Sequence, residues 1–140
     1  MVQTASGEIQ AAIGNVLVPG GNLDATLTSL GITGIFDQRG VPENQPFDYI
    51  TIGDTIETPN NTLGRRGYNN TVTIHIWSRQ FGQKTVQAMI ARLNQLFDQV
   101  HLNLATQAHV YTMYDQSMYL PQPDGLTLHA PVRYRFYTEE

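Results

Sequence analysis

Residues 71–97, TVTIHIWSRQFGQKTVQAMIARLNQLF, change their hydrophobic period once, and this change decides the fold class. In the first part, Val72, Ile74 and Ile76 alternate with other side chains, which is the period of a β-strand with one buried face. From Gln83 to Val100 the apolar positions recur at the spacing of an amphipathic helix. The stretch therefore predicts a strand over residues 71–79, followed by a long helix.

The segment before this stretch predicts a second strand. Residues 49–57, YITIGDTIE, alternate in the same way, and the spacing places Ile50, Ile52 and Ile56 on one face. Residues 58–70, TPNNTLGRRGYNN, contain one proline, two glycines and four asparagines, a composition that does not continue a strand. We therefore expect an antiparallel strand pair joined by a long mobile loop over residues 58–70.

The remaining segments complete an α+β pattern. Alternation and turn signals, including Asp124-Gly125, separate them. The order predicts a single α+β domain over residues 1–140, with a mostly antiparallel four- to five-stranded sheet and two main helices packed on one face. The further expected elements are helices at Thr4–Val18 and Ala25–Leu30, and strands at Gly34–Asp37, Ala108–Met118 and Leu126–Thr138.

The composition excludes several classes of function. The 140 residues include no cysteine, which rules out disulfides, thiolate metal sites and cysteine nucleophiles. The net charge of −4 argues against a protein that grips nucleic-acid phosphates with its whole surface. No apolar run approaches the roughly 20 residues that a membrane span needs, and the N-terminus lacks the pattern of a secretory signal. We expect no membrane partner.

One face of the predicted sheet has the composition of a protein contact surface. Several of the residues that alternate with the apolar positions are aromatic or basic. Surfaces rich in aromatic residues and arginine but poor in lysine are typical of protein–protein interfaces. The alternative is a solvated sheet face with a partly covered tryptophan. The candidate contact residues on this face are His75, Trp77, Arg133, Arg135 and Tyr137.

The predicted loop carries a local basic cluster. Arg65 and Arg66 lie between two glycines and are followed by Tyr68. These three residues are further candidates for contact with a partner or a neighbouring copy, and the arginines equally suit nucleic-acid phosphates or solvent.

The sequence contains no recognisable catalytic motif. The only lysine, Lys84, lacks the upstream glycine of a phosphate-binding loop, and no serine lies in a Gly-x-Ser-x-Gly elbow. His75, His109 and His129 fall on three predicted strands, but no two of them have the spacing of metal ligands. We therefore expect no catalytic residue, no metal site and no cofactor, and a protein that is not an enzyme.

Several short motifs, in order, resemble those of a known family. Residues 46–53, PFDYITIG, are similar to its proline-tyrosine-apolar-glycine signature, although Asp48 stands where the family usually has a second proline. The family is the tail-completion, or tail-terminator, proteins of long-tailed double-stranded DNA bacteriophages. The other matching segments are Gly34–Asp37, Val41–Glu43, Ile76–Arg79 with Gly82, Asp124–His129 and Val132–Phe136.

The resemblance implies a structural role without catalytic residues. Such a protein forms a homo-oligomeric ring of about six subunits, which caps the major tail-tube protein, ends tube growth and meets the neck or head-completion protein, while DNA passes through the lumen without specific binding. It implies a virion location in the tail or neck, after assembly in the host cytoplasm. The alternatives are a head-side neck adaptor or stopper, and a nucleic-acid-binding module that uses Arg65, Arg66, Arg133 and Arg135.

Overall fold

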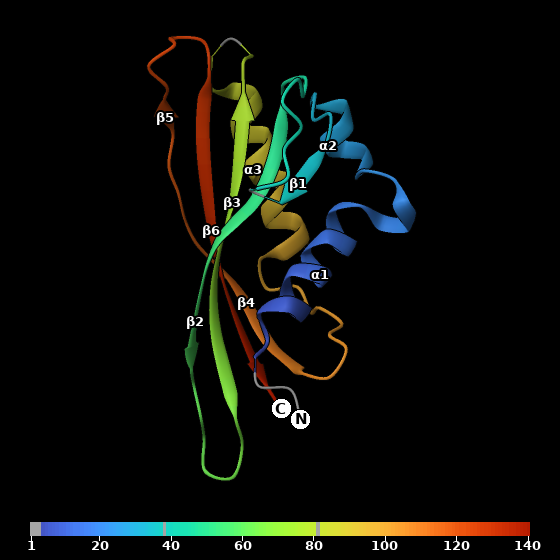
Figure 1. Cartoon of the computed structure of the whole chain (residues 1–140), viewed down its shortest axis with the longest axis vertical. Helices are drawn as coiled ribbons and strands as arrows, with labels where there is room; N and C mark the ends of the chain where they lie inside the picture. Colours follow the sequence, from blue (N-terminus) through green and yellow to red (C-terminus); the bar gives the residue numbers. More distant parts are fainter. Residues whose placement is uncertain (1–3, 38, 81) are drawn as a thin grey trace.

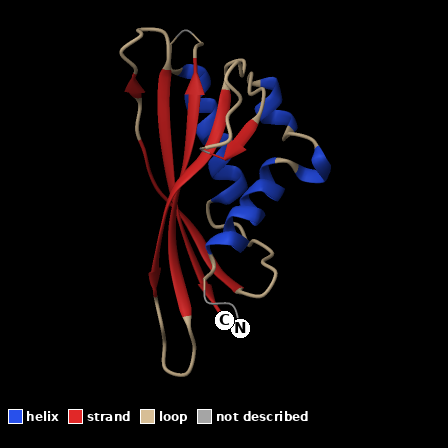
Figure 2. Cartoon of the chain, viewed as in Figure 1, coloured by secondary structure: helices blue, strands red, loops and turns tan. Residues whose placement is uncertain are grey.

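The structure, a computed structural model, describes residues 4–37, 39–80 and 82–140. It is an α+β fold, as predicted (Figures 1 and 2). Its helices are α1 (Ser6–Leu17), the 3-10 turn η1 (Pro19–Gly21), α2 (Ala25–Ser29) and α3 (Lys84–Phe97). Its strands are β1 (Ile35–Asp37), β2 (Tyr49–Pro59), β3 (Gly67–Ser78), β4 (Ala108–Ser117), β5 (Leu120–Pro121) and β6 (Leu128–Glu139).

The sheet is larger than predicted and is mixed. Its six strands follow the order β1-β2-β3-β6-β4, and β5 pairs with β6 beside that path. All pairs are antiparallel except β1 with β2, which is parallel. The prediction of four to five strands did not include β5. This strand has only two residues, beside a proline-rich turn, and two residues are too few to show a period.

The helices α1, α2 and α3 cover one face of this sheet, and the core lies between the two layers (Figure 2). The predicted inward residues of β3 are buried, including Val72 and Ile74, and four alternate residues of β6 are buried with them: Ala130, Val132, Tyr134 and Phe136. On α3 the apolar stripe is buried as well, and the Tyr134 hydroxyl donates a hydrogen bond to Asn94 Oδ1 across the layers at 2.6 Å. Burial of one strand face and one helix stripe is the main source of stability in such a fold.

The face assignment of Ile56 was wrong. Ile50 and Ile52 are buried under the helices, whereas Ile56 is 61% exposed on the opposite face. The strand register shifts between Gly53 and Thr55, and the bulged residue, Asp54, has a positive φ of 47°. Since an extra residue in one strand reverses the faces of all later side chains, the bulge turns Ile56 away from the core.

The loop predicted over residues 58–70 is shorter than expected. Strand β2 continues to Pro59 and β3 begins at Gly67, so the connection spans residues 60–66. Thr62 and Arg65 exchange two backbone hydrogen bonds of 3.1 Å, which close a tight turn around Leu63 and Gly64. The segment is thus a long β-hairpin that projects beyond the rest of the molecule (Figure 1). Cross-strand pairing between sequence-distant residues overrides the weak strand propensity of its asparagines.

Candidate partner-contact surface

The sheet face turned away from the helices carries the candidate contact residues. The register places Trp77 beside His129, Thr73 beside Arg133, and Asn69 beside Tyr137. Because paired residues of an antiparallel ladder share a face, Trp77, Arg133, Arg135, Tyr137 and His75 come together on one side. We call this side the open face.

An aromatic row crosses the open face near the start of β6. The rings of Trp77 and His129 are parallel, with centroids 3.9 Å apart, and the rings of His75 and His129 are 4.8 Å apart. Tyr49 extends the row from β2. The indole Nε1 of Trp77 donates to Thr51 Oγ1 at 3.1 Å, so the indole is held in place at its polar edge. We call these four rings the aromatic row: Tyr49, Trp77, His129 and His75.

The two histidines of the row form a hydrogen-bonded chain with the bulged aspartate. His75 Nδ1 lies 2.6 Å from His129 Nε2, and His75 Nε2 lies 2.9 Å from Asp54 Oδ2. With both rings neutral, His129 Nε2–H donates to His75, and His75 Nε2–H donates to the carboxylate, so every facing atom has a partner. Burial, followed by the nearby His75, lowers the pKa of His129 to about 4, against a smaller opposing effect of Asp54.

The arginines of the open face are paired with acids. Arg133 Nε donates to Asp115 Oδ2 at 2.7 Å, and Arg135 Nη2 lies 3.4 Å from the other oxygen of the same carboxylate. Asp115 sits at a second bulge, between Tyr114 and Gln116 of β4. One carboxylate between two guanidinium groups leaves a weaker positive field than two arginines in solvent would have.

Farther along the open face, exposed apolar side chains gather around a tyrosine pair. The rings of Tyr111 and Tyr137 stack at 4.3 Å. Ile56 and Met113 are both exposed, and they occupy one row of the sheet, across Thr71 and Arg135. Sequence reasoning placed Ile56 on the core face, because the bulge that turns it to this face leaves no signal in the alternation. It did not single out Met113.

Tyr68 and His75 do not offer the surface that was expected of them. Tyr68 is only 8% exposed and belongs to the core, because its position beside Pro59 and Thr138 turns it to the helix-covered side. That expectation for Tyr68 is corrected. His75 lies on the open face as predicted, but it is 5% exposed, so it is the buried member of the aromatic row and offers a partner little surface.

The basic pair of the predicted loop lies at the end of the hairpin. Arg65 closes the turn with its backbone and approaches Glu139 with its Nη1 at 3.4 Å. The backbone carbonyl of Arg66 accepts a hydrogen bond from Glu140 N–H at 2.9 Å. Leu63, which lies in the turn between the end of β2 and Arg65, is fully exposed. An apolar residue before glycine in a two-residue turn was a visible signal, but sequence reasoning did not use it.

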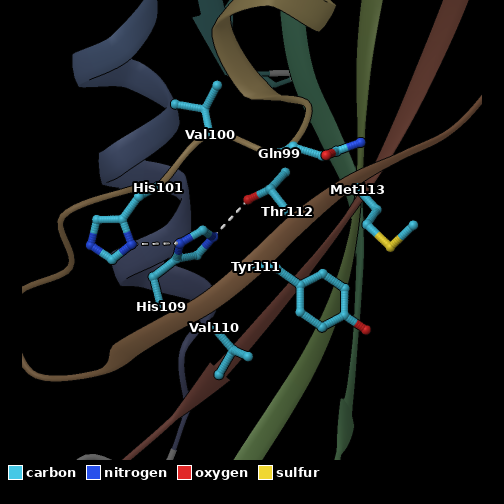
Figure 3. Close-up of a pocket in the computed structure, with 8 residues that line it drawn as sticks. All are labelled: Gln99, Val100, His101, His109, Val110, Tyr111, Thr112 and Met113. Atoms are coloured by element: carbon cyan, nitrogen blue, oxygen red, sulfur yellow. Dashed lines mark hydrogen bonds between the residues drawn. The ribbon is translucent and has the colours of Figure 1, made fainter.

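A groove of about 580 Å³ runs along the outer side of β4 (Figure 3). Its two walls are the strand itself and the segment after α3. Val110, Tyr111 and Met113 contribute apolar surface, and His109 faces His101 with 3.4 Å between their Nδ1 atoms. Burial, followed by the nearby His101, lowers the pKa of His109.

The three histidines considered for a metal site are not assembled into one. His75 and His129 meet on the open face, whereas His109 lies on the helix-covered side and bonds Thr112. Within residues 4–37, 39–80 and 82–140, no group of three or more histidines and acids is arranged to hold a metal ion. No helix among these residues is long and apolar enough to cross a membrane.

Comparison with known proteins places this geometry in context. A family model described as "Tail completion protein gp17" matches residues 21–139. No protein with a curated description matches the sequence. Fifteen chains of solved structures resemble this chain, and two of them illustrate the likeness. One, from the "Virion of native gene transfer agent (GTA) particle", has a TM-score of 0.85 at 19% identity, over 99% of this chain and 100% of that chain. The other has a TM-score of 0.56 at 15% identity, over 99% of this chain and 97% of that chain. At such identities the likeness establishes a shared fold.

Proposed function

The chain belongs to the tail completion protein gp17 family, and from this premise we propose that it caps the tail tube of a phage-like virion as a ring of about six subunits. Family membership identifies a structural protein of the virion tail. In the proposed role the ring ends polymerisation of the major tail-tube protein, joins the tail to the neck or head-completion protein, and lets DNA pass. The match over most of the chain is the observation that carries this proposal.

The surface chemistry supports a protein-binding role. The open face combines aromatic rings and arginines, which are enriched at protein interfaces, and its Arg133 and Arg135 share the carboxylate of Asp115. Residues of this face, together with the hairpin end, are therefore our candidates for contact with neighbouring subunits, the tube or the neck. They are Trp77, Arg133, Arg135, Tyr137, Arg65 and Arg66, with His75 beneath them.

The charges also suit a conduit that DNA crosses without being held. Each subunit carries a net −4, so a ring of several copies is strongly acidic and repels phosphates. Arg133 and Arg135, which a nucleic-acid-binding module would need, share the carboxylate of Asp115. This pairing makes the nucleic-acid alternative the weaker one.

The test is whether the chain assembles and caps tubes. Size-exclusion chromatography with light scattering is expected to give a hexamer, either alone or after mixing with tail tubes, and electron microscopy is expected to show a ring at one tube end. Adding the chain during tube polymerisation is expected to shorten the tubes. A chain that remains monomeric with tube protein present, and leaves tube length unchanged, contradicts the proposal. Rings found on heads and absent from tubes identify the head-side adaptor instead.

A further inference from the structure

Two complementary features lie on opposite edges of the sheet. The order β1-β2-β3-β6-β4 puts the β2–β3 hairpin toward one edge and β4 at the other. The hairpin presents a fully exposed Leu63, and the outer side of β4 presents a groove with apolar walls. A leucine in water and an open apolar groove are each unfavourable, and one contact between them relieves both.

The end of the hairpin is held in one conformation. Thr62 and Arg65 exchange backbone hydrogen bonds, and Asn60 N–H donates to the carbonyl of Gly67 at 2.8 Å. Gly67 N–H donates to Asn61 Oδ1 at 3.2 Å. Gly64, with a φ of 82°, supplies the left-handed conformation that the turn requires. Leu63 is therefore presented on an ordered turn, so little conformational entropy is lost when it binds.

The groove suits a side chain better than an added strand. The outer edge of β4 is partly occupied, because Gln99 N–H donates to the Thr112 carbonyl at 2.9 Å and Tyr114 N–H donates to Asp98 Oδ1 at 2.9 Å. Register shifts at His109/Tyr111 and at Tyr114/Gln116 interrupt the edge further. Bulges and covered backbone groups protect an edge strand from pairing with another strand. What stays available is apolar side-chain surface, chiefly Val110 and Met113.

We propose that Leu63 of one copy of this chain seats in the β4 groove of the next copy. The inference rests on the proposed ring, and it names the contact that builds it. A knob and a groove at different edges make a head-to-tail contact, and such contacts close into rings when the rotation between copies allows. Arg65 beside the knob is paired with Glu139, so the contact that we propose is mainly an apolar one.

Cysteine cross-linking tests the contact directly, since the natural chain has no cysteine. The double variant Leu63→Cys/Val110→Cys, oxidised alone and on tail-tube ends, is expected to give a ladder of linked subunits on a non-reducing gel. An equal mixture of the two single variants is expected to give dimers only. As a matched control, Leu126→Cys replaces Leu63→Cys with another exposed leucine outside the hairpin, and it is expected not to link to Val110→Cys.

An affinity measurement gives a second readout. Leu63→Ser is expected to weaken subunit association about tenfold or more, because the variant loses the large apolar side chain that the contact buries. Leu126→Ser is expected to leave association unchanged, and circular dichroism checks that both variants fold. Rings that form normally without links between positions 63 and 110, or with Leu63→Ser at natural affinity, overturn this inference and leave the ring standing. A chain that forms no ring, alone or on tubes, overturns the proposed function and this inference with it.

Discussion

At the start of β2, one buried carboxylate anchors the strand at the position where the resembled family usually has a proline. Asp48 accepts hydrogen bonds from Ser78 Oγ at 3.0 Å, from Arg79 N–H at 2.9 Å and from Gln80 Nε2 at 2.6 Å. These bonds join Asp48, the residue that precedes β2, to the last residue of β3 and the two residues after it. The departure from the family motif therefore leaves the beginning of the strand well anchored.

Replacing Asp48 is expected to destabilise the fold. Asp48→Ala leaves a buried serine hydroxyl and a backbone N–H without their acceptor, so we expect a loss of about 2–4 kcal/mol in the free energy of unfolding. Urea denaturation followed by circular dichroism measures this. The control is the exposed Asp37, whose carboxylate bonds only the side chain of Gln10 among the described contacts. Asp37→Ala is expected to change stability by no more than about 0.5 kcal/mol, and an equal effect of both variants contradicts the role of Asp48.

The histidine pair of the aromatic row makes stability depend on pH. The pKa of His129 is lowered to about 4 in the folded protein and is about 6.5 in an unfolded chain. The unfolded state therefore binds more protons between these values, and the stabilising contribution is complete above pH 6.5 and lost as the pH falls toward 4. After allowance for solvent screening, we expect about 1–2 kcal/mol.

Unfolding measured in urea at pH 7 and at pH 5 checks this dependence. His129→Gln is expected to reduce the difference between the two pH values and to leave the part that comes from the lowered pKa of His109. His101→Gln, in the segment after α3, is expected to preserve most of the difference. The same slope in His129→Gln as in the natural chain contradicts the assignment.

At the scale of elements, the hairpin and the first helix respond oppositely to the same substitution. A Cβ on Gly67 would lie 2.4 Å from the Asn60 carbonyl oxygen and 3.1 Å from that of Thr138, so the strands must separate to admit it. Gly67→Ala is expected to destabilise the protein by about 1–3 kcal/mol. Gly14, within α1, has no atom within 4 Å of an added Cβ, and Gly14→Ala is expected to stabilise by about 0.5–1 kcal/mol.

Thermal unfolding distinguishes these two outcomes, because the two variants are expected to shift the midpoint in opposite directions. If Gly67→Ala also raises the midpoint, the close approach of the hairpin backbone to Asn60 is not a constraint on the fold.

At the scale of the whole molecule, pairing of charges decides how DNA meets the surface. Asp115→Asn removes the carboxylate shared by Arg133 and Arg135 and leaves both guanidinium groups for phosphates. We expect it to bind duplex DNA more tightly than the natural chain at low salt, with the gain lost as salt is raised. Fluorescence anisotropy of labelled duplex measures the change. Asp37→Asn makes the same change in net charge away from the open face, and equal gains in both variants would show that only net charge matters.

The sequence alone determined the α+β class, the inward faces of β3 and β6, the stripe of α3 and the family resemblance. These features follow from side-chain period and short motifs, which are local properties of the chain. The same information placed Trp77, Arg133, Arg135 and Tyr137 correctly on one face, because alternation within a strand needs no knowledge of its neighbours.

Only the tertiary structure decided which of these residues meet. The bulges at Asp54 and Asp115 expose Ile56 and bring a carboxylate between two arginines, and the register joins His75 to His129 while it leaves His109 on the other side. Strand pairing also takes up both ends of the expected loop and leaves a short turn that carries Leu63. Each of these outcomes depends on pairing between strands that are far apart in the chain, and a shift of one residue in that pairing reverses a whole face without altering the local pattern.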